Sequence, residues 1–198
     1  QQKIPHAIEY IRSFLEENPP NGDGPPRKLT VFVHHKDVGE AIADAIRDMA
    51  SEFGMNPGFY FRGDSSAGEK DVFARKCAEF HWYSENPSDR LLVASTLSGG
   101  EGLNLQACYD GLLVERQWNP QNESQAKGRF PRPGSSAKSN VFWKTLTLLG
   151  SHDETMVEIN ERKASYMPNI TGDVSESDWK ESEFMLELAR AIRERRKA

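Results

Sequence analysis

The strongest constraint on the fold is a series of short apolar segments separated by stretches with helical periodicity. Five segments have the composition of β-strands: residues 29–34, 57–61, 91–94, 111–114 and 141–149. Two of them, Leu91–Ala94 and Gly111–Val114, are almost continuously apolar, which is typical of strands buried on both faces. Strands that alternate with helices favour right-handed crossovers. We therefore predict an α/β fold with a mostly parallel sheet between layers of helices.

Helical periodicity recurs between these strands and before the first of them. Residues 1–17 are predicted to form an amphipathic N-terminal helix. A second helix is expected after the first strand, with Asp37 as its cap, and further helices are expected over 69–80 and 153–165. We expect one domain over residues 1–166, a Pro-, Ser- and Asp-containing linker over 167–180, and a charged helical tail over 181–198.

Composition excludes several classes of protein. The chain has 198 residues, of which 37% are hydrophobic, enough for a single packed domain with an added arm. Its 25 Lys and Arg against 30 Asp and Glu give a net charge of −5, so it is not a general polyanion binder, although one basic groove on an acidic body is compatible with nucleic acid. No apolar run approaches the roughly 20 residues that cross a bilayer, and the first residues lack a signal-peptide pattern. We therefore expect no membrane partner and an intracellular location.

Metal and disulfide chemistry are not expected. The two cysteines, Cys77 and Cys108, have neither metal-ligand spacing nor the numbers of a disulfide framework. His34 and His35 are adjacent, and adjacent residues of a strand point to opposite sides, so they are not expected to ligate one metal.

The loop after the strand ending at Ala94 is the first candidate site. It reads Ser95-Thr96-Leu97-Ser98-Gly99-Gly100-Glu101-Gly102. Hydroxyls and glycines allow backbone N–H groups to approach a phosphate, and in open parallel sheets ligands gather beyond the carboxyl ends of the strands. A tight turn between a strand and a helix explains the same composition equally well.

The second candidate site is the segment from Trp118 to Arg132. Pro120 suits the start of a helix, on which Gln125 and Arg129 would share one face. Pro131 disfavours helical geometry at the residue before it, so Arg132 is expected to leave the helix. Guanidinium groups bind phosphate oxygens bidentately, and two of them near a glutamine could contact a transferring phosphoryl group. Surface arginines at a helix end are the alternative.

Taken in order, these segments resemble the second RecA-like lobe of superfamily-two helicases, and specifically of Swi/Snf-type ATP-dependent DNA translocases. That family has a Ser-Thr, glycine-rich loop, then Trp-Asn-Pro, then Gln-Ala-x-x-Arg-x-x-Arg. Here these correspond to residues 95–105, 118–120 and 125–132. The resemblance covers roughly residues 3–165 and implies a RecA-like parallel sheet sandwiched between helices.

The resemblance implies a role for each matching residue. Arg129 and Arg132 would be arginine fingers for ATP held by another lobe, and Gln125 would position them. Glycine-loop residues expected near the nucleotide are Gly100, Glu101 and Gly102. Residues expected to contact the DNA backbone are Ser95, Thr96, His35, Lys36, Arg62, Gly63 and Asp64. Trp118 and Asn119 would couple the DNA groove to the nucleotide cleft.

The function implied is that of the C-terminal lobe of an ATP-dependent double-stranded-DNA translocase. ATP and Mg²⁺ would be bound mainly by an N-terminal RecA-like lobe that this chain lacks, so the chain alone is expected to hydrolyse ATP negligibly. The expected partners are double-stranded DNA, that lobe and a nucleoprotein target, in the nucleus of a eukaryote or the cytoplasm of a prokaryote.

Two alternatives stay open. Pro131 and Pro133-Gly134-Ser135 stand where the family usually has His and Ile-Gly-Gln, which changes how Arg132 is aimed. These departures favour a non-catalytic interaction module derived from a helicase lobe. A strand-separating superfamily-two helicase is the second alternative, and the Trp-Asn-Pro-Gln segment argues against it.

Overall fold

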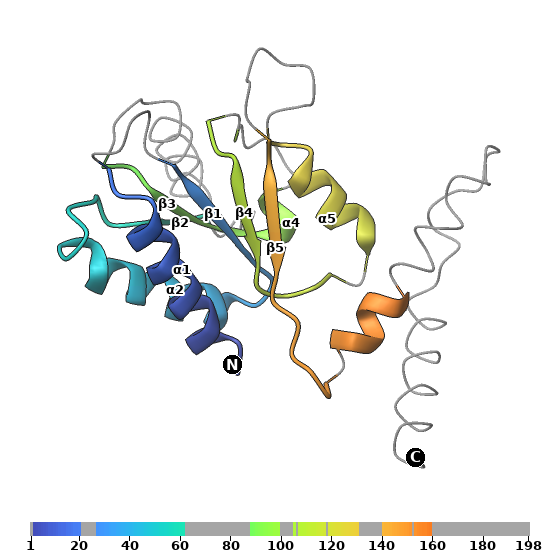
Figure 1. Ribbon diagram of the computed structural model, residues 1–198. Coiled ribbons are helices and arrows are strands. Elements are labelled where there is room, and N and C mark those ends of the chain that lie inside the picture. Colours follow the sequence, from blue (N-terminus) through green and yellow to red (C-terminus); the bar gives the residue numbers. More distant parts are fainter. Residues whose placement is uncertain are drawn as a thin grey trace, which may run out of the picture. The chain divides into compact units, whose positions relative to one another are not determined.

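The five apolar segments form one sheet in the computed structural model (Figure 1). The structure describes residues 2–20, 27–61, 88–99, 105, 107–117, 119–130, 140–151 and 153–159. The elements are α1 (Ile4–Glu17), β1 (Leu29–Val33), α2 (Lys36–Ala50), β2 (Phe59–Phe61), β3 (Leu91–Ser95), α4 (Thr96–Gly99), β4 (Asp110–Leu113), α5 (Pro120–Lys127) and β5 (Phe142–Thr145). The predicted helix over 69–80 lies outside the described residues.

All pairings in the sheet are parallel, and the strand order is β2-β3-β1-β4-β5. The central strand β1 pairs with β3 on one side and β4 on the other, so that Leu29 lies opposite both Leu91 and Asp110. All five residues of β1 are buried. A strand covered on both faces and paired at both edges has no polar side to present, which accounts for its apolar run. The predicted α/β fold class is confirmed.

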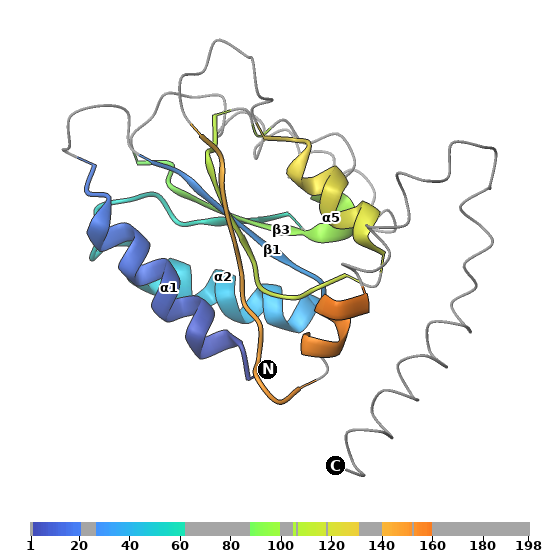
Figure 2. The same ribbon diagram turned by 45° about the vertical axis from the view of Figure 1, so that its right-hand side comes forward.

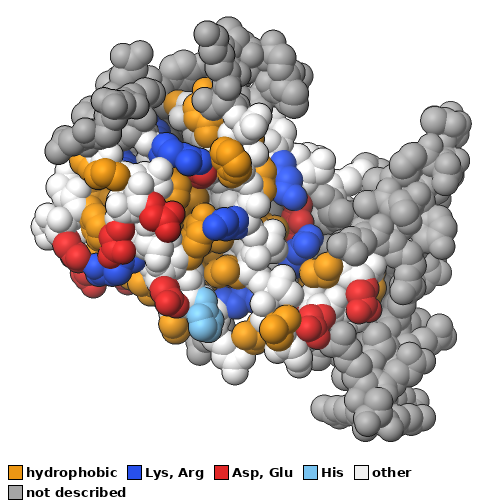
Figure 3. All heavy atoms as spheres, in the orientation of Figure 1, with side chains coloured by type: hydrophobic (Ala, Val, Ile, Leu, Met, Phe, Trp, Pro, Cys, Tyr) orange, Lys and Arg blue, Asp and Glu red, His pale blue; other side chains and the backbone are white. Residues whose placement is uncertain are grey.

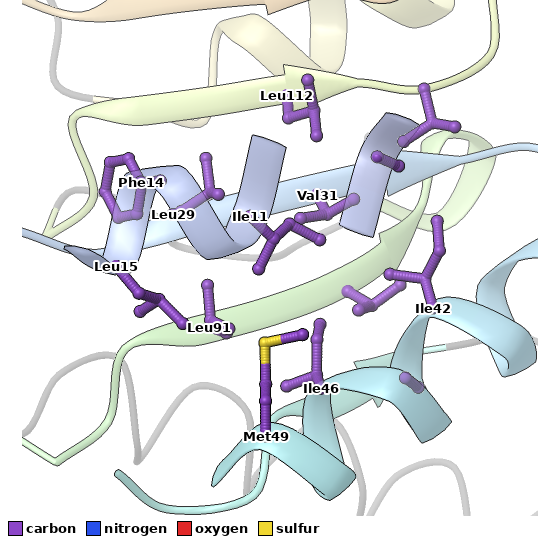
Figure 4. Packing of buried hydrophobic residues seen from close by; sticks show 14 of the residues in the cluster. Ile11, Phe14, Leu15, Leu29, Val31, Ile42, Ile46, Met49, Leu91 and Leu112 are labelled. Atoms are coloured by element: carbon purple, nitrogen blue, oxygen red, sulfur yellow. The ribbon is translucent and has the colours of Figure 1, made fainter. Parts of the chain in front are cut away.

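Two helices cover one face of the sheet (Figure 2). Ile11, Phe14 and Leu15 of α1 and Ile42, Ile46 and Met49 of α2 pack with Leu29, Val31, Leu91 and Leu112 in one buried cluster (Figure 4). The strand residues of this cluster alternate along β1, because successive side chains of a strand point to opposite faces. Burial of these apolar stripes holds α1 and α2 on the sheet.

The opposite face carries a second cluster, which α5 helps to cover. Phe32, Leu92 and Leu113 point to this side and pack with Ala126 of α5 and with Phe130. The rings of Phe130 and Trp143 meet edge-on with centroids 4.6 Å apart, and Trp143 also lies 5.5 Å from Phe32. The turn after α5 is therefore anchored to the sheet by aromatic packing.

The crossovers define a topological switch point between β1 and β4. The chain leaves β1 toward β2 at one edge of the sheet and leaves β4 toward β5 at the other. Adjacent strands whose connections diverge leave a crevice at their carboxyl ends, where ligands of open α/β sheets bind. The residues after Val33 and Leu113 lie at this switch point.

Two sequence-based expectations differ from the structure in detail. α2 begins at Lys36 with His35 in the N-cap position and no capping side chain, so the expected Asp37 cap is wrong; Asp37 lies in the first turn, where its charge complements the helix dipole. The last strand was expected over 141–149 but spans Phe142–Thr145, because β4 offers only four pairing positions. Cys108 is buried and free, whereas Cys77 lies outside the described residues.

The chain divides into two compact units, Gln1–Gln117 with Gln121–Leu146, and Trp118–Pro120 with Thr147–Ala198. The sheet belongs to the first unit. In the second unit, a helix begins at Asp153, as expected. The carboxylate of Asp153 accepts a hydrogen bond from the Leu148 N–H at 2.9 Å. The predicted linker 167–180 and tail 181–198 lie outside the described residues, so this domain division stays a prediction. Among the described helices, none is long and apolar enough to cross a membrane.

Candidate functional site

Four of the predicted site residues meet at the carboxyl edge of the sheet. His35 and Lys36 follow β1, whereas Ser95 ends β3 and Thr96 begins α4. Val33 and Ser95 are paired neighbours. His35 and Lys36 are exposed, whereas Ser95 and Thr96 are buried. The structure thus brings together DNA-contact candidates that are about sixty residues apart in the chain.

The Thr96 hydroxyl is committed to the fold. Its Oγ1 donates a hydrogen bond to the carbonyl of Val33 at 3.1 Å, and the side chain has no exposed surface. This bond ties the start of α4 to the end of β1. The hydroxyl proton is therefore not directed at solvent, and the DNA contact of Thr96 stays a prediction.

Glu115, which belongs to none of the sequence motifs, binds the residues that follow β1 at this edge. One carboxylate oxygen accepts the backbone N–H groups of His34 and His35 at 2.8 and 2.9 Å, and the other lies 2.8 Å from Nδ1 of His35. Burial by itself would raise the pKa of Glu115, but these hydrogen bonds outweigh it and hold the pKa below its ordinary value. A charged carboxylate thus joins the segment after β4 to the end of β1.

The two histidines at this edge lie side by side. Their ring centroids are 4.8 Å apart in an edge-on arrangement, so the expectation that they point to opposite sides is wrong. The strand ends at Val33, and beyond it the alternation of a strand no longer applies. Burial lowers the pKa of His34, and the neighbouring His35 lowers it further.

Glu123 ties α5 to the segment after β4. Its Oε1 accepts the backbone N–H of Gln117 at 2.9 Å, and its Oε2 accepts from the Arg116 guanidinium at 3.1 Å. Only 6% of the Glu123 side chain and 19% of the Arg116 side chain are exposed. This buried ion pair fixes the start of the helix that carries Gln125. Its signal in the sequence was an acidic residue in the first turn of a helix after a proline.

Arg129 lies in the turn after α5 rather than on the helix. The helix ends at Lys127. The Gly128 N–H still donates to the Ser124 carbonyl, but the following bonds, from Arg129 to Ala126 and from Phe130 to Lys127, have three-residue spacing. The expected common helical face of Gln125 and Arg129 is therefore wrong: Gln125 is exposed on α5, and Arg129 is half-buried beyond it. The tighter turn follows from Gly128, a poor helix former, and from Pro131 close behind.

The end of the glycine-rich segment (residues 95–105) meets the turn that carries Arg129, called here the arginine turn, at Leu105. The N–H of Leu105 donates to the carbonyl of Arg129 at 3.2 Å. Leu105 also accepts from Cys108, whose thiol bonds to the carbonyl of Lys28 just before β1 begins. Figure 1 shows α5 running back along the sheet, so that Arg129 follows its far end. The arginine turn and the DNA-contact candidates thus lie toward opposite ends of the strands.

Several predicted site residues lie outside the described part of the chain. These are Arg132, Gly100, Glu101, Gly102, Arg62, Gly63, Asp64 and Trp118. Asn119 is described and exposed. Their roles stay predictions.

The described residues hold no group of three or more His, Cys, Asp or Glu side chains that could bind a metal ion. Basic and acidic side chains are interspersed on the face drawn in Figure 3.

Known proteins with similar sequences include a helicase-DNA-binding protein and a chromatin-remodeling ATPase. Chromodomain-helicase-DNA-binding protein 1 from Homo sapiens is 34% identical over 89 residues, 45% of this chain. Chromatin-remodeling ATPase INO80 from Mycosarcoma maydis is 29% identical over 111 residues, 56% of this chain. Zorya protein ZorD from Escherichia coli is 25% identical over 157 residues, 77% of this chain. No protein-family model matches the chain.

The chain is a homologue of Swi/Snf-type helicases. The matched segments amount to 5% of the human protein, 6% of the INO80 protein and 14% of ZorD. The chain thus corresponds to a small part of these relatives.

Solved structures with the same fold are RecA-like helicase domains. The C-terminal part of the Fun30 ATPase domain superposes with a TM-score of 0.55 and 21% identity, over 68% of this chain and 39% of that one. Domain 2 of the Mss116p DEAD-box helicase, bound to an RNA duplex, gives a TM-score of 0.61 and 17% identity, over 82% of this chain and 56% of that one. The Swi/Snf homologue therefore has the predicted RecA-like fold, with its sheet between helices.

Proposed function

We propose that this chain is the second RecA-like lobe of an ATP-dependent double-stranded-DNA translocase. It would supply Arg129 and Arg132 to ATP held on a partner lobe, while the carboxyl edge of its own sheet contacts the DNA backbone. In a eukaryote, this function would lie in the nucleus.

The single observation that carries the proposal is the hydrogen bond between Leu105 and Arg129. It joins Leu105, at the end of the glycine-rich segment, to the turn that carries Arg129, which supports a shared role for the two segments. Phe130, which is buried against the sheet, fixes this turn. A guanidinium at this turn can stabilise the charge that develops on a transferring phosphoryl group.

The DNA side of the proposal rests on the carboxyl edge. His35 and Lys36 are exposed there, next to the start of α2, where backbone N–H groups and the helix dipole favour an anion. Contacts of this kind bind the phosphate backbone without reading base sequence, as a translocase requires. The two sites would lie toward opposite ends of the sheet.

ATP and Mg²⁺ would be bound mainly by the N-terminal lobe. The described residues of this chain do not form a metal-binding cluster, so we assign none of them to Mg²⁺. The part assigned to this chain is contact with the γ-phosphoryl group through its arginines, which would be made only when the two lobes close.

The test is DNA-stimulated ATP hydrolysis by the full-length protein carrying Arg129→Ala or Arg132→Ala. An arginine finger contributes about 10³–10⁵ in rate, so we expect each substitution to lower kcat at least a hundredfold. The matched control is Arg47→Ala, since Arg47 is an exposed arginine on α2 that pairs with Asp44. It should leave the rate unchanged.

Each other result points to a different function. Loss of activity only with Arg129→Ala would mean that Pro131 and Pro133 aim Arg132 elsewhere. ATPase activity that neither substitution changes, or no ATPase activity at all, would favour the non-catalytic interaction module. Unwinding of duplex DNA by the wild type would favour a strand-separating helicase. Rapid hydrolysis by this chain alone would contradict the proposal.

A further inference from the structure

We infer that Glu115 is a positioning residue that holds the His35 ring with Nδ1 toward its carboxylate and Nε2 outward, so that the charged ring donates Nε2–H to a DNA phosphate. The inference rests on the proposed function, because it concerns how the carboxyl edge would contact DNA. It adds a residue that the sequence motifs do not include and a proton that the contact requires.

The first step is the geometry of the carboxylate. Oε2 of Glu115 accepts the backbone N–H groups of His34 and His35, and Oε1 lies 2.8 Å from Nδ1 of His35. The Glu115 side chain is 17% exposed, whereas that of His35 is 69% exposed. The carboxylate is thus fixed by the backbone, while the ring that it orients extends into solvent.

The second step is the position of the ring proton. A carboxylate only accepts hydrogen bonds, so Nδ1 of His35 must carry a hydrogen to make this contact. In the neutral ring Nε2 is then an acceptor, which a phosphate oxygen cannot satisfy. In the charged ring Nε2 carries a hydrogen and donates to the phosphate. The contact that Glu115 permits is therefore coupled to uptake of a proton by His35.

The third step is the charged surroundings of the ring. Among the described residues, Glu115 faces it from the end of β4, and the His34 ring lies 4.8 Å away at the end of β1. Lys36 and Asp37 follow in the first turn of α2. Glu115 and a DNA phosphate would lie on opposite nitrogens of the same ring, so each nitrogen would have a negatively charged acceptor.

The tautomer can be measured without DNA. Nitrogen-15 NMR of the imidazole should show the neutral His35 ring with its hydrogen on Nδ1. In Glu115→Gln the amide oxygen can still accept the two backbone N–H groups, but the amide NH₂ then faces Nδ1. We expect that variant to fold and its His35 hydrogen to move to Nε2. A hydrogen on Nε2 in the wild type would overturn the inference.

The second experiment measures DNA affinity of the full-length protein against pH and salt. Wild-type affinity should rise as the pH is lowered from about 8 to about 6, the range in which imidazole ordinarily titrates. His35→Ala should weaken binding about tenfold at pH 6 and much less at pH 8. At pH 6 it should also reduce the slope of log affinity against log salt by about one, the loss of one phosphate contact.

The pH dependence of DNA affinity in Glu115→Gln shows whether Glu115 positions the His35 ring or only supports the fold. Its neutral His35 ring would carry Nε2–H, so its DNA affinity should no longer vary with pH. Adding His35→Gln to Glu115→Gln should leave the pH profile flat. The matched control is His6→Ala, which removes an exposed histidine of α1 and should leave the wild-type pH dependence intact.

The outcomes distinguish this inference from the proposed function. DNA binding with a normal salt dependence, but with the same pH profile in the wild type, Glu115→Gln and His35→Ala, would overturn the inference and leave the translocase proposal standing. A full-length protein that does not bind DNA at all would overturn both.

Discussion

At the scale of single residues, the carboxylate of Glu123 is a buried charge that needs partners inside the protein. With 5% of the residue exposed, it must be satisfied inside the protein, and Arg116 and the Gln117 N–H do so. Breaking a buried pair leaves an uncompensated charge, which costs more than an exposed pair contributes.

We expect Glu123→Ala to lower the free energy of unfolding by about 3 kcal/mol, because the Arg116 guanidinium would stay largely buried without its partner. Urea denaturation followed by circular dichroism measures this. Glu123→Gln retains an acceptor for the Gln117 N–H, and its cost should be smaller.

The matched control is Glu52→Ala, which removes an exposed partner of Arg12. An exposed pair contributes about 0–1 kcal/mol, so this change should be small. Equal losses at Glu52 and Glu123 would mean that the Glu123 pair does not hold α5 in place.

Residue identities alone did not reveal the roles of Glu115 and Glu123. The sequence places Glu115 beside Arg116 and Gln117 but does not show which backbone N–H groups its carboxylate accepts. Those partners, His34 and His35, are brought near only when β1 and β4 pair. Motif comparison selected the exposed His35 and the turn residue Arg129, but not the carboxylates that support the local structure.

At the scale of elements, the packing of the Trp143 indole over β4 depends on a glycine. Gly111 lies opposite Trp143, and a Cβ atom added at Gly111 would lie 2.6 Å from a carbon of the Trp143 ring. The missing side chain lets the indole lie over the strand and reach Phe130 and Phe32. The aromatic packing that fixes the arginine turn thus depends on this glycine.

Gly111→Ala should therefore destabilise the protein by about 1–3 kcal/mol, the usual cost of overpacking a core. The shift of the indole should also change the tryptophan fluorescence spectrum. Gly128→Ala is the control, since its Cβ would meet only carbonyl oxygens at 3.4 Å. It should be neutral or stabilising by up to about 1 kcal/mol. A Gly111→Ala variant as stable as the wild type would show that the indole has room to move.

The elements themselves were largely predictable from the sequence. β1, β3 and β4 are within one residue of the predicted segments at most ends, because continuous apolar runs bounded by polar residues mark buried strands. The end of β5 and the end of α5 were not. The length of β5 is set by its partner β4, and α5 tightens at Gly128, so pairing and turn geometry overrode local propensity.

At the scale of the whole molecule, the free energy of unfolding should depend on pH through His34. Folding lowers the pKa of His34 below its ordinary value of 6.5, so below that pH the unfolded chain takes up a proton more readily than the folded one. The stability that the neutral ring allows is present above pH 6.5 and is lost as the pH falls through the lowered pKa.

We expect the free energy of unfolding to fall as the pH drops below about 6.5, through the lowered pKa of His34, and again below about pH 4.5, where protonation removes the favourable charge of Glu115. Urea titrations at several pH values measure both stages. His34→Leu should flatten the first stage and leave the second, because its backbone N–H still donates to Glu115. A first stage that persists in His34→Leu would assign it to another group.

The parallel order of the sheet, with β1 at its centre, also determines when its strands can pair during translation. Leu29 finds its partner Leu91 only after about sixty more residues have been made, and its other partner Asp110 later still. At a translation rate of about 5–20 residues per second, both edges of β1 stay unpaired for several seconds during synthesis. During that interval the most apolar strand of the fold is open to chaperones and to other nascent chains. A synonymous codon change that slows translation between Leu29 and Leu91 would lengthen the interval without altering a single side chain.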